Sequence, residues 1–340
     1  MTWTLLVLLL AASPDAGTEN DRRTRELMHT EVTIALPAAV PLEVREAAFT
    51  EGFAVFERIE AELNEWKPGS ALARINAGEG KPVEAPPLVC EVVSLALDGA
   101  KRTGGLFDPS WAALRGVWKF GSAEDGVVPA KEQVAALCPK VQWEQVNLNP
   151  RPDGSCTVKL GLPGMQLGLG GLVKGWGVDR VVTALRKRGL KDFYVQAGGD
   201  LYVGGNNGGR PWRVGIRDPR GAKTASFARL ELSDAAFSTS GDYEHFFIAD
   251  GVRYHHLIDP RTCWPARASV STTVLAKSAT DAEFLTKAAF ILGPKEGQKL
   301  VRQFGAAAVW VTRDGQVHAT AGLEKQLEVW PPSGLDGGAP

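Results

Sequence analysis

The amino-acid sequence predicts an α+β fold in one domain. Segments with the apolar spacing of helices and segments with the alternation of strands follow one another without a regular order, which disfavours a doubly wound parallel sheet. The 340 residues contain no repeat at a solenoid period and no long linker. We therefore expect a single domain of roughly 300 residues around one core.

Three elements are predicted in the N-terminal third of the chain. Residues 31–40 alternate as a half-buried strand does, whereas the charged stretch 18–27 before them is assigned no element. Residues 41–63 place phenylalanine and other apolar side chains at helical spacing. A polar loop is expected over 64–80. A second helix, from about 87 to 103, should end at the glycine pair that follows it.

The middle of the chain supplies a glycine-rich turn, a helix and a strand. Residues 121–165 are rich in glycine and proline and include short strand-like pieces. After them, apolar residues recur at helical spacing from Val178 to Leu185, and Gly189 should end that helix. The segment FYVQA, residues 193–197, is expected to be a strand.

The C-terminal part is predicted to contain several strands and one helix. The helix covers 282–292 and should stop at Gly293 and Pro294, because glycine and proline commonly end helices. Residues 332–340 are expected to form a disordered tail. Further strands are predicted over 212–218, 226–232, 235–241, 270–276, 306–312 and 316–320.

The N-terminus carries an apolar run from Trp3 to Ala12, which has the length of a secretory h-region and is too short to span a bilayer. We therefore expect a signal peptide over residues 1–18 and an exported, periplasmic protein whose domain spans 25–331. The run is not preceded by Lys or Arg, and Pro14 stands near the cleavage point. A cytoplasmic protein with an apolar start is the alternative.

The charge balance excludes one class of partner. Lys plus Arg total 38 and Asp plus Glu total 39, which gives a formal net charge of -1. No net field would recruit nucleic acid or an anionic membrane surface. We therefore expect no nucleic-acid partner.

The four cysteines, Cys90, Cys138, Cys156 and Cys263, are widely separated and form no C-x-x-C pair. This spacing excludes the common zinc-ribbon patterns. In an oxidising compartment one disulfide can form, and Cys138 with Cys156 is the pair nearest in sequence. The alternative is four buried, reduced side chains.

Two glycine clusters flank the central helix. The first, residues 168–175, contains Lys174 but matches neither the Walker pattern nor G-x-G-x-x-G. Glycines at a helix N-terminus together with a lysine suit an anion, and a tight strand-to-helix turn is the alternative. The second cluster, residues 196–200, places Asp200 beside bare backbone, which suits either a ligand or a simple hairpin.

Histidines gather late in the chain, at His245, His255 and His256, with Asp242 and Asp259 nearby. Neighbouring residues of a strand point to opposite faces, so at most one of the adjacent pair faces a given ligand. A zinc site made only of protein side chains is therefore not expected. The sequence also lacks the G-x-S-x-G elbow of hydrolases.

Two residues elsewhere are candidates for ligand contact. Asp108 precedes a proline at the end of a helix, where an Asx turn is the structural alternative. Trp66 is an aromatic residue in a polar loop, so we expect it to be packed or to stack on a planar ligand.

In their order along the chain, seven short blocks resemble the FAD:protein FMN transferases, the ApbE family, from about Met28 to Gly297. This ordered set is far more specific than any single glycine motif. The blocks are NEWKPGSALARIN, GGLFDPS, LGLGGLVKGWGVDRV, VQAGGDLYVGG, WRVGIRDP, STSGDYEHFF and YHHLIDPRTCWPA.

The resemblance implies an enzyme that binds FAD and transfers its FMN half to a Thr or Ser hydroxyl of an acceptor protein, with release of AMP. It also implies a T-fold-like domain with mixed helices and mainly antiparallel strands, action outside the cytoplasm in many members, and usually Mg²⁺. A membrane would be reached only through the acceptor or an uncleaved leader. The FAD contacts implied by the matching blocks are Met28, Trp66, Leu106, Phe107, Asp108, Gly170, Lys174, Trp176, His256 and Asp259.

The implied chemistry explains why these residue types are needed. Attack on a pyrophosphate builds charge on nonbridging oxygens, which a helix N-terminus, a lysine and a divalent ion can stabilise. The acceptor hydroxyl must lose a proton, so a base is needed, and Asp200, Asp242 and His256 are the candidates, in no fixed order. The alternatives to transfer are hydrolysis of FAD to FMN and AMP, and an exported FAD-binding protein without catalysis.

One block departs from the family pattern. There the metal is typically held by a backbone carbonyl of the glycine turn, here Val173, and by an Asp and a Thr four residues apart on a later helix. Ungapped counting places Glu283 and Lys287 at those two positions. Glu283 can bind Mg²⁺, but a protonated lysine cannot, so a flanking residue, Asp281 or Thr286, would have to compensate. The candidate metal ligands are Val173, Glu283 and Thr286. Either Lys287 supplies the charge of the metal, or the metal site is weakened, or Lys287 extends to solvent.

Overall fold

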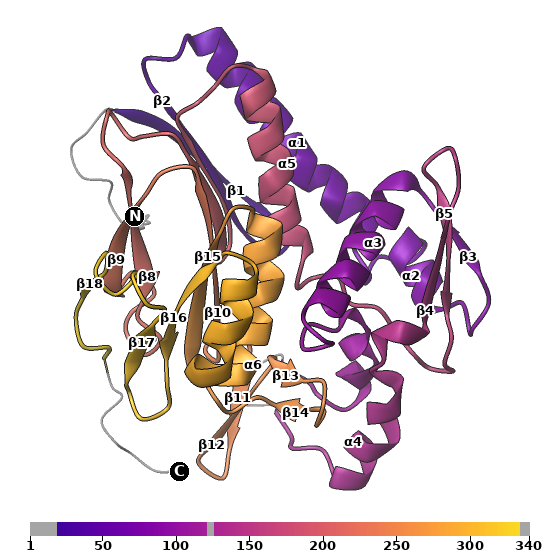
Figure 1. The fold of residues 1–340 in the computed structure, drawn as a ribbon. Coiled ribbons are helices and arrows are strands. Elements are labelled where there is room, and N and C mark those ends of the chain that lie inside the picture. The colour runs from indigo at the N-terminus through magenta and orange to yellow at the C-terminus, as the bar shows by residue number, and fades with distance from the viewer. Residues whose placement is uncertain (1–18, 121–125, 334–340) are drawn as a thin grey trace, which may run out of the picture.

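The computed structural model describes residues 19–120 and 126–333, and its centre is an eight-stranded sheet (Figure 1). The strand order is β1-β2-β6-β7-β10-β15-β16-β17, and every neighbouring pair is antiparallel. Distant parts of the chain therefore meet in one sheet. The strands are β1 (Asn20–Leu27), β2 (Thr30–Pro37), β6 (Phe193–Ala197), β7 (Asp200–Gly204), β10 (Ala235–Gly241), β15 (Ser271–Ala276), β16 (Ala307–Val311) and β17 (Val317–Ala319).

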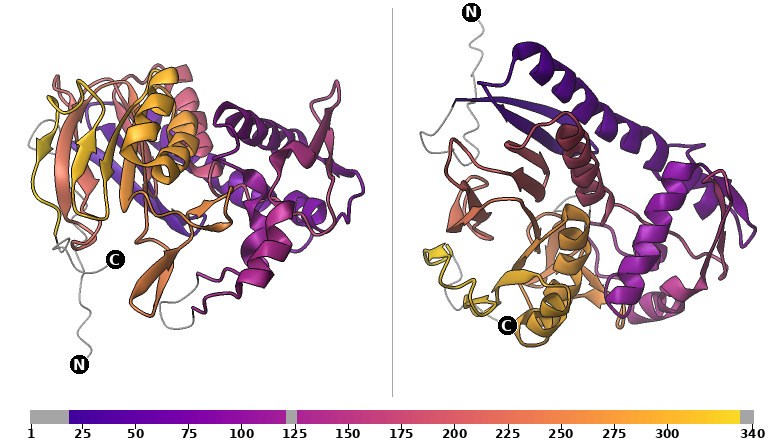
Figure 2. Two further views of the ribbon diagram at one scale, coloured as in Figure 1. Left: turned by 60° about the horizontal axis from the view of Figure 1, so that its bottom comes forward. Right: turned by 45° about the horizontal axis from the view of Figure 1, so that its top comes forward.

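Three helices cover one face of this sheet and a smaller sheet covers the other (Figures 1 and 2). The helices are α1 (Leu42–Leu63), α5 (Val173–Lys187) and α6 (Ala279–Gln303), which share the larger hydrophobic cluster. A second cluster lies between the central strands and the smaller sheet. The smaller sheet consists of β18 (Glu328–Val329), β9 (Ser226–Leu232) and β8 (Trp212–Arg217).

Short elements lie beside the helical layer, with two hairpins below the sheet in Figure 1. Strands β3, β5 and β4 form a three-stranded sheet of their own. The elements are α2 (Ala71–Asn76), β3 (Val83–Ala85), α3 (Pro87–Arg102), η1 (Pro109–Gly116), α4 (Lys131–Leu137), η2 (Cys138–Lys140), η3 (Trp143–Gln145), β4 (Val146–Pro150) and β5 (Cys156–Leu160). The hairpins are β11 (Phe246–Ala249) with β12 (Val252–His255), and β13 (Ile258–Asp259) with β14 (Trp264–Pro265).

The predicted mixture of helices and mainly antiparallel strands is confirmed. The helix expected over 41–63 is α1, and the helix expected over 87–103 is α3. On α1, the apolar stripe buries Phe49, Phe53 and Phe56, which is why helical spacing identified it. Where the spacing of apolar residues was regular, the local sequence was sufficient to predict the helix.

The predicted polar loop over 64–80 is wrong in part, because it contains the short helix α2. Ser70 caps this helix by accepting the backbone N–H of Ala73 at 3.1 Å. Leu72 and Ile75 are buried beneath it. Tertiary packing stabilises a helix that is too short to form alone.

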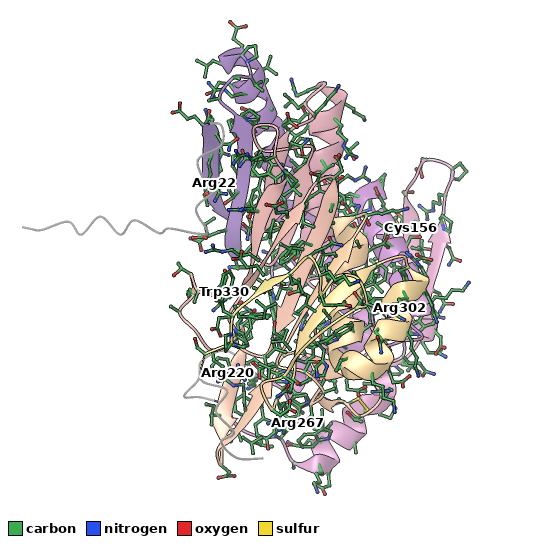
Figure 3. All side chains as sticks on the ribbon, turned by 60° about the vertical axis from the view of Figure 1, so that its left-hand side comes forward. Arg22, Cys156, Arg220, Arg267, Arg302 and Trp330 are labelled. Atoms are coloured by element: carbon green, nitrogen blue, oxygen red, sulfur yellow. A yellow bond between two sulfur atoms is a disulfide. The ribbon has the colours of Figure 1, made fainter. Side chains whose placement is uncertain are left out.

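The charged stretch to which no element was assigned forms the edge strand β1. Its arginine side chains have partners in neighbouring elements. Arg25 pairs with Glu57 of α1 at 2.9 Å. The guanidinium of Arg22, labelled in Figure 3, lies 5.0 Å from the ring centre of Tyr194. Charged edge strands resist pairing with other chains, and their charges hide the alternation of a strand.

The predicted stop at Gly293 is a kink rather than an end. The first part of α6 breaks at Gly293, where φ is 70°, and helix resumes through Pro294 to Gln303. Proline is well accommodated at the first position of a new helical segment, where its missing N–H leaves no broken bond.

Both expectations for the cysteines are wrong. The structure contains two disulfides, Cys90–Cys156 and Cys138–Cys263. Cys156, labelled in Figure 3, lies on β5 against α3, which carries Cys90. Proximity in sequence therefore did not indicate proximity in space.

The ends of the chain lie largely outside the described residues. This holds for the expected signal peptide, residues 1–18, and for most of the expected tail, 332–340. At the start of that tail the backbone N–H of Ser333 donates to Asp218 at 2.8 Å. Within 19–120 and 126–333, no helix is long and apolar enough to cross a membrane.

Candidate active site

The first glycine cluster leads directly into α5, so Lys174 lies in the first turn of that helix. Its ammonium donates to the carbonyl of Gly170 at 3.0 Å. Gly170 is exposed, and a Cβ added there would meet nothing within 4 Å, so its backbone is open to a ligand. A cation beside bare backbone at a helix N-terminus is the arrangement that binds anions.

Two buried carboxylates flank Lys174. Its ammonium lies 2.8 Å from Oε1 of Glu283 and 3.6 Å from Oδ2 of Asp200. Burial alone would lower the pKa of Lys174, but the charges of Glu283 and Asp200 raise it above its usual value. Lys174 is therefore protonated at neutral pH, and it offsets carboxylates that would otherwise be costly to bury.

Glu283 joins α6 to the start of α5. Its second carboxylate oxygen, Oε2, accepts the backbone N–H of Gly175 at 2.7 Å. A Cβ at Gly175 would lie 2.4 Å from the carbonyl oxygen of Ala279, so only glycine allows the two helices to approach this closely. Burial would raise the pKa of Glu283, but Lys174 and Lys287 lower it below its usual value.

The second glycine cluster is a hairpin turn, and it positions Asp200. Ala197 pairs with Asp200 across the turn, in which Gly198 has a φ of 59°. Ser238 of β10 donates to Oδ1 of Asp200 at 2.5 Å. Burial and the negative charge of Glu283 raise the pKa of Asp200 to about 6. This carboxyl group can therefore change its protonation near neutral pH.

Lys287 turns inward, so of the alternatives for this residue the structure does not support extension to solvent. Its ammonium donates to the backbone carbonyl of Glu283 at 2.9 Å and lies 3.5 Å from Oε1 of the same residue. Only 20% of the Lys287 side chain is exposed. The ammonium groups of Lys287 and Lys174 thus both lie close to Oε1 of Glu283.

Thr286 faces the same cluster. Its hydroxyl donates to the backbone carbonyl of Ala282 at 2.7 Å and lies 3.1 Å from the hydroxyl of Ser238. Ser238 thereby links Thr286 to Asp200. Sequence reasoning predicted a strand over 235–241 but missed this bridging role of Ser238, which depends on the pairing of β10 with β7.

The adjacent histidines have different environments, as their opposite faces predict. His255 is buried, and His256 is half-buried. The Nδ1 atom of His256 lies 3.3 Å from the backbone carbonyl of His245. Burial, reinforced by the neighbouring histidines and the charge of Lys287, lowers the pKa of His256 to about 3. His256 is therefore neutral at physiological pH. With Nδ1 donating to the carbonyl, its Nε2 can accept a proton.

Asp242 and Asp259 are engaged elsewhere. Both carboxylate oxygens of Asp242 accept from the guanidinium of Arg220, at 2.7 and 2.8 Å. Arg220 is labelled in Figure 3. Asp259 accepts from the side chain of Arg261, with the shortest distance at 2.7 Å. Asp242 is thus paired with an arginine, whereas Asp200 is paired with Lys174.

Asp108 forms an Asx turn, which was the structural alternative to ligand contact. It accepts from the backbone N–H of Ser110 at 2.8 Å and from the Ser110 hydroxyl at 2.6 Å. Burial raises the pKa of Asp108 despite these bonds. The preceding Phe107 lies against Gly171, at 3.4 Å from a Cβ built there, and Leu106 packs against the hydrophobic cluster that contains Phe290.

The three remaining implied FAD contacts belong to different parts of the fold. Trp66 is 70% exposed, with the guanidinium of Arg115 5.1 Å from its ring centre. Trp176 is buried, and its indole N–H donates to Glu91 of α3 at 3.2 Å. Met28 occupies the β1–β2 turn with a φ of 54°. Of these, Trp66 presents the aromatic surface that a planar ligand would need.

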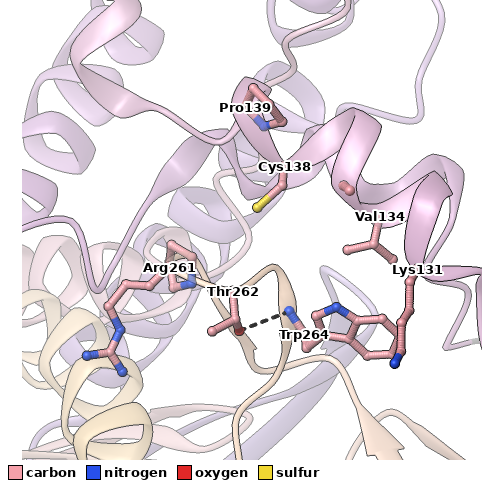
Figure 4. Close-up of a pocket in the computed structure, with 9 residues that line it drawn as sticks. Lys131, Val134, Cys138, Pro139, Arg261, Thr262 and Trp264 are labelled. Atoms are coloured by element: carbon pink, nitrogen blue, oxygen red, sulfur yellow. Dashed lines mark hydrogen bonds between the residues drawn. The ribbon is translucent and has the colours of Figure 1, made fainter.

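A surface pocket of about 560 Å³ lies between α4 and the β13–β14 hairpin (Figure 4). Its lining includes Cys138, which forms a disulfide with Cys263, and Thr262. The hydroxyl of Thr262 accepts the backbone N–H of Trp264 at 3.3 Å. None of the charged residues around Lys174 lines this pocket. Because the glycine turn combines a cation with open backbone at a helix N-terminus, we place the candidate active site there.

The donors at the glycine turn do not fit the expected Mg²⁺. Both carboxylate oxygens of Glu283 already accept hydrogen bonds, and the Thr286 hydroxyl donates into its own helix. Lys287 brings a positive charge to the position where a ligand is needed. In the described parts of the chain, no group of three or more His, Cys, Asp or Glu side chains could hold a metal ion. The implied set of Val173, Glu283 and Thr286 is therefore not arranged as a Mg²⁺ site.

Comparison with known proteins shows which family this chain resembles. A sequence model described as the ApbE family matches residues 28–310. A curated relative from Treponema pallidum, "FAD:protein FMN transferase", is 32% identical over 345 residues, covering 96% of this chain and 94% of the relative. A curated protein of the same name from Vibrio cholerae is 30% identical, covering 92% of this chain and 93% of the relative.

Solved structures show the same fold. The ApbE protein from Thermotoga maritima aligns with a TM-score of 0.81 at 28% identity, covering 91% of this chain and 99% of that chain. The flavin transferase ApbE from Vibrio cholerae aligns with a TM-score of 0.77 at 26% identity, covering 91% of this chain and 99% of that chain. Since the family model spans most of the sequence and the relatives match over nearly their whole length, the chain belongs to the ApbE family.

Proposed function

We propose that this protein transfers FMN from FAD to a Thr or Ser hydroxyl of an acceptor protein and releases AMP. Family membership supports the reaction class. One observation supports the site: Lys174, protonated and in the first turn of α5, lies beside the open backbone of Gly170. A pyrophosphate seated there would meet a cation and a helix N-terminus at once.

In this proposal the acceptor oxygen attacks the phosphorus of the FMN half. A new O–P bond forms, and the bond from that phosphorus to the bridging oxygen breaks. AMP leaves with the bridging oxygen and its electron pair. Negative charge grows on the nonbridging oxygens, and the ammonium of Lys174 stabilises it without reorganisation, because Glu283 and Asp200 hold that ammonium in place.

The proton of the acceptor hydroxyl goes to His256 in this mechanism. Its ring is neutral and its Nε2 is left to accept when Nδ1 donates to His245. Burial is the main cause of the low pKa of His256, and a bound pyrophosphate raises its basicity only by the smaller contribution of Lys287, whose charge it counters. Asp200 is the second candidate, with a pKa of about 6. Asp242 is the weakest of the three, because Arg220 occupies both its oxygens.

The position of FAD beyond its pyrophosphate is also part of the proposal. The isoalloxazine would stack near the exposed Trp66, and Phe107 would form the wall behind Gly171. The acceptor is a protein, as in the relatives called FAD:protein FMN transferase, and in this proposal its target is an accessible Thr or Ser. No step depends on Mg²⁺, because the donors do not fit it.

Export to the periplasm is proposed on chemical grounds. Two disulfides need an oxidising compartment to form and persist. The apolar run in residues 3–12 is consistent with secretion. Fractionation of cells that produce the full chain tests this, and recovery in the cytoplasm with reduced cysteines would contradict it.

The function is tested by replacing Lys174. The protein is incubated with FAD and a panel of peptides containing Thr or Ser, and AMP is measured by chromatography. We expect Lys174→Met to lower AMP formation roughly 100-fold, because one preorganised charge contact is lost. Covalent flavin fluorescence on a peptide supports transfer, whereas free FMN supports hydrolysis.

The matched control is Lys187→Met, which removes an exposed lysine from the last turn of the same helix. It should keep AMP formation within about twofold of wild type, because surface charges contribute little. Equal rates in the Lys174 and Lys187 variants would contradict the proposed site. Unchanged, tightly bound FAD in the wild-type protein would instead indicate a binding protein without catalysis.

A further inference from the structure

The charges at the glycine turn balance without any ion. Lys174 and Lys287 supply two positive charges, and Asp200 and Glu283 supply two negative charges. The side chains of Asp200 and Glu283 are 4% and 0% exposed, so their charges are compensated by neighbours rather than by water. A divalent cation added to this cluster would leave an excess of two buried positive charges.

The oxygen atoms that a cation would need are also occupied. Oε1 of Glu283 accepts from Lys174, and Oε2 accepts from the backbone of Gly175. Oδ1 of Asp200 accepts from Ser238. To gain Glu283 as a ligand, a hard cation would have to compete with Lys174 or with the backbone N–H of Gly175. Oδ2 of Asp200 lies 3.6 Å from the ammonium of Lys174.

The stem of Lys287 holds its ammonium at the turn. Its Cε lies 3.3 Å from the position of a Cβ on Gly171, so the side chain runs along the glycine backbone. The ammonium donates to the carbonyl of Glu283 and lies 3.5 Å from Oε1 of that residue. With 20% of the side chain exposed, the charge is anchored yet within reach of a ligand at the turn.

We propose that the ammonium of Lys287 is a built-in cation of this active site, so that cleavage of FAD by this protein needs no divalent metal. This rests on the proposed function, because the charge acts on the pyrophosphate of FAD. Lys287 and Lys174 together neutralise the charge that develops on the nonbridging oxygens. A lysine at this position thus makes the chain independent of Mg²⁺ supply.

The first test measures metal binding directly, without turnover. MgCl₂ is titrated into the purified, metal-free protein by calorimetry. We expect no binding below about 10 mM for the wild type and at least a tenfold gain in affinity for Lys287→Thr, which removes the competing charge. Lys299→Thr is the control, since Lys299 is an exposed residue of α6 that pairs with Glu296 at 2.8 Å. Submillimolar binding by both wild type and Lys299→Thr would overturn the proposal.

The second test measures AMP formation with EDTA and with MgCl₂. The wild-type rate should change less than about twofold between the two, and Lys287→Met should lose about 100-fold in EDTA. A wild-type rate that EDTA abolishes and MgCl₂ restores would overturn the proposal. If the wild type binds FAD but forms no AMP in either condition, the proposed function fails, while the calorimetry still decides the role of Lys287.

Discussion

At the scale of single residues, the adjacent histidines show how a strand separates two roles. Nε2 of His255 lies 2.9 Å from the backbone carbonyl of Ala266, and its Nδ1 accepts the N–H of Leu257 at 3.3 Å. One nitrogen must donate and the other must accept, so the ring is a neutral tautomer that supports the backbone. His256 faces the charge of Lys287 instead.

The buried ring of His255 should make stability depend on pH. Burial lowers the pKa of His255 to about 4, below the value of about 6.5 in an unfolded chain. Above pH 6.5 the ring is neutral in both states, so it gives no pH dependence there. As the pH falls from 6.5 towards 4, the unfolded chain binds a proton that the folded ring refuses, and stability is lost.

We therefore expect His255→Asn to be less sensitive to acid than the wild type. Between pH 7.5 and pH 5, the wild type should lose ~2 kcal/mol more of its unfolding free energy than the variant does. Urea unfolding at both pH values measures this difference. His318→Asn, at an exposed position of β17, should behave as wild type. Equal losses in all three proteins would contradict the assignment.

Site residues were predictable from the sequence where a block was local, and less so where the chain folds back. The glycine turn with Lys174 was a candidate anion site, with a tight turn as the alternative, and Glu283 and Lys287 were singled out because they depart from the family pattern. That Ser238 bridges Asp200 and Thr286 was not predictable, because three separate elements meet there. Local motifs identify a turn, but only the fold shows which charges face it.

At the scale of elements, α5 and α6 cap each other. Asp179 of α5 accepts the backbone N–H groups of Ala279 and Thr280, each at 2.8 Å, at the start of α6. In return, Glu283 of α6 accepts the N–H of Gly175 at the start of α5. Each helix supplies a carboxylate to the positive end of the other, which fixes their register.

Removal of one cap should weaken this pair of helices. Asp179→Ala leaves two N–H groups without their acceptor, so we expect a loss of ~2 kcal/mol in unfolding free energy. Chemical unfolding monitored by circular dichroism measures it. Asp281→Ala, which removes only a partly exposed partner of Arg102, should cost less than ~1 kcal/mol. Equal costs for both variants would show that the reciprocal cap contributes nothing specific.

Helices and strands with a regular apolar pattern were predicted correctly, and the exceptions share one cause. The strand β1 and the helix α2 depend on contacts with α1 and the core rather than on their own sequence pattern. The kink at Gly293 depends on the second helical segment packing Val301 into the core. Tertiary contact, which no local window contains, decided these three segments.

At the scale of the whole molecule, the two disulfides join parts of the chain that the sequence keeps apart. Cys90–Cys156 closes a sequence separation of 66, and Cys138–Cys263 closes one of 125. Four cysteines allow three complete pairings, and sequence distance alone favoured a wrong one. The longer link ties η2, beside α4, to the β13–β14 hairpin, which follows His256 in the chain.

The longer disulfide should therefore matter both for stability and for the site. From loop closure, we expect the double variant Cys138→Ala with Cys263→Ala to lose about 5 kcal/mol of unfolding free energy, and Cys90→Ala with Cys156→Ala about 4 kcal/mol. The first variant should also bind FAD more weakly, because the hairpin that follows His256 loses its anchor. Urea unfolding and quenching of flavin fluorescence measure the two effects. Native protein with titratable thiols, or a first double variant with wild-type stability, would show that this link does not hold the fold together.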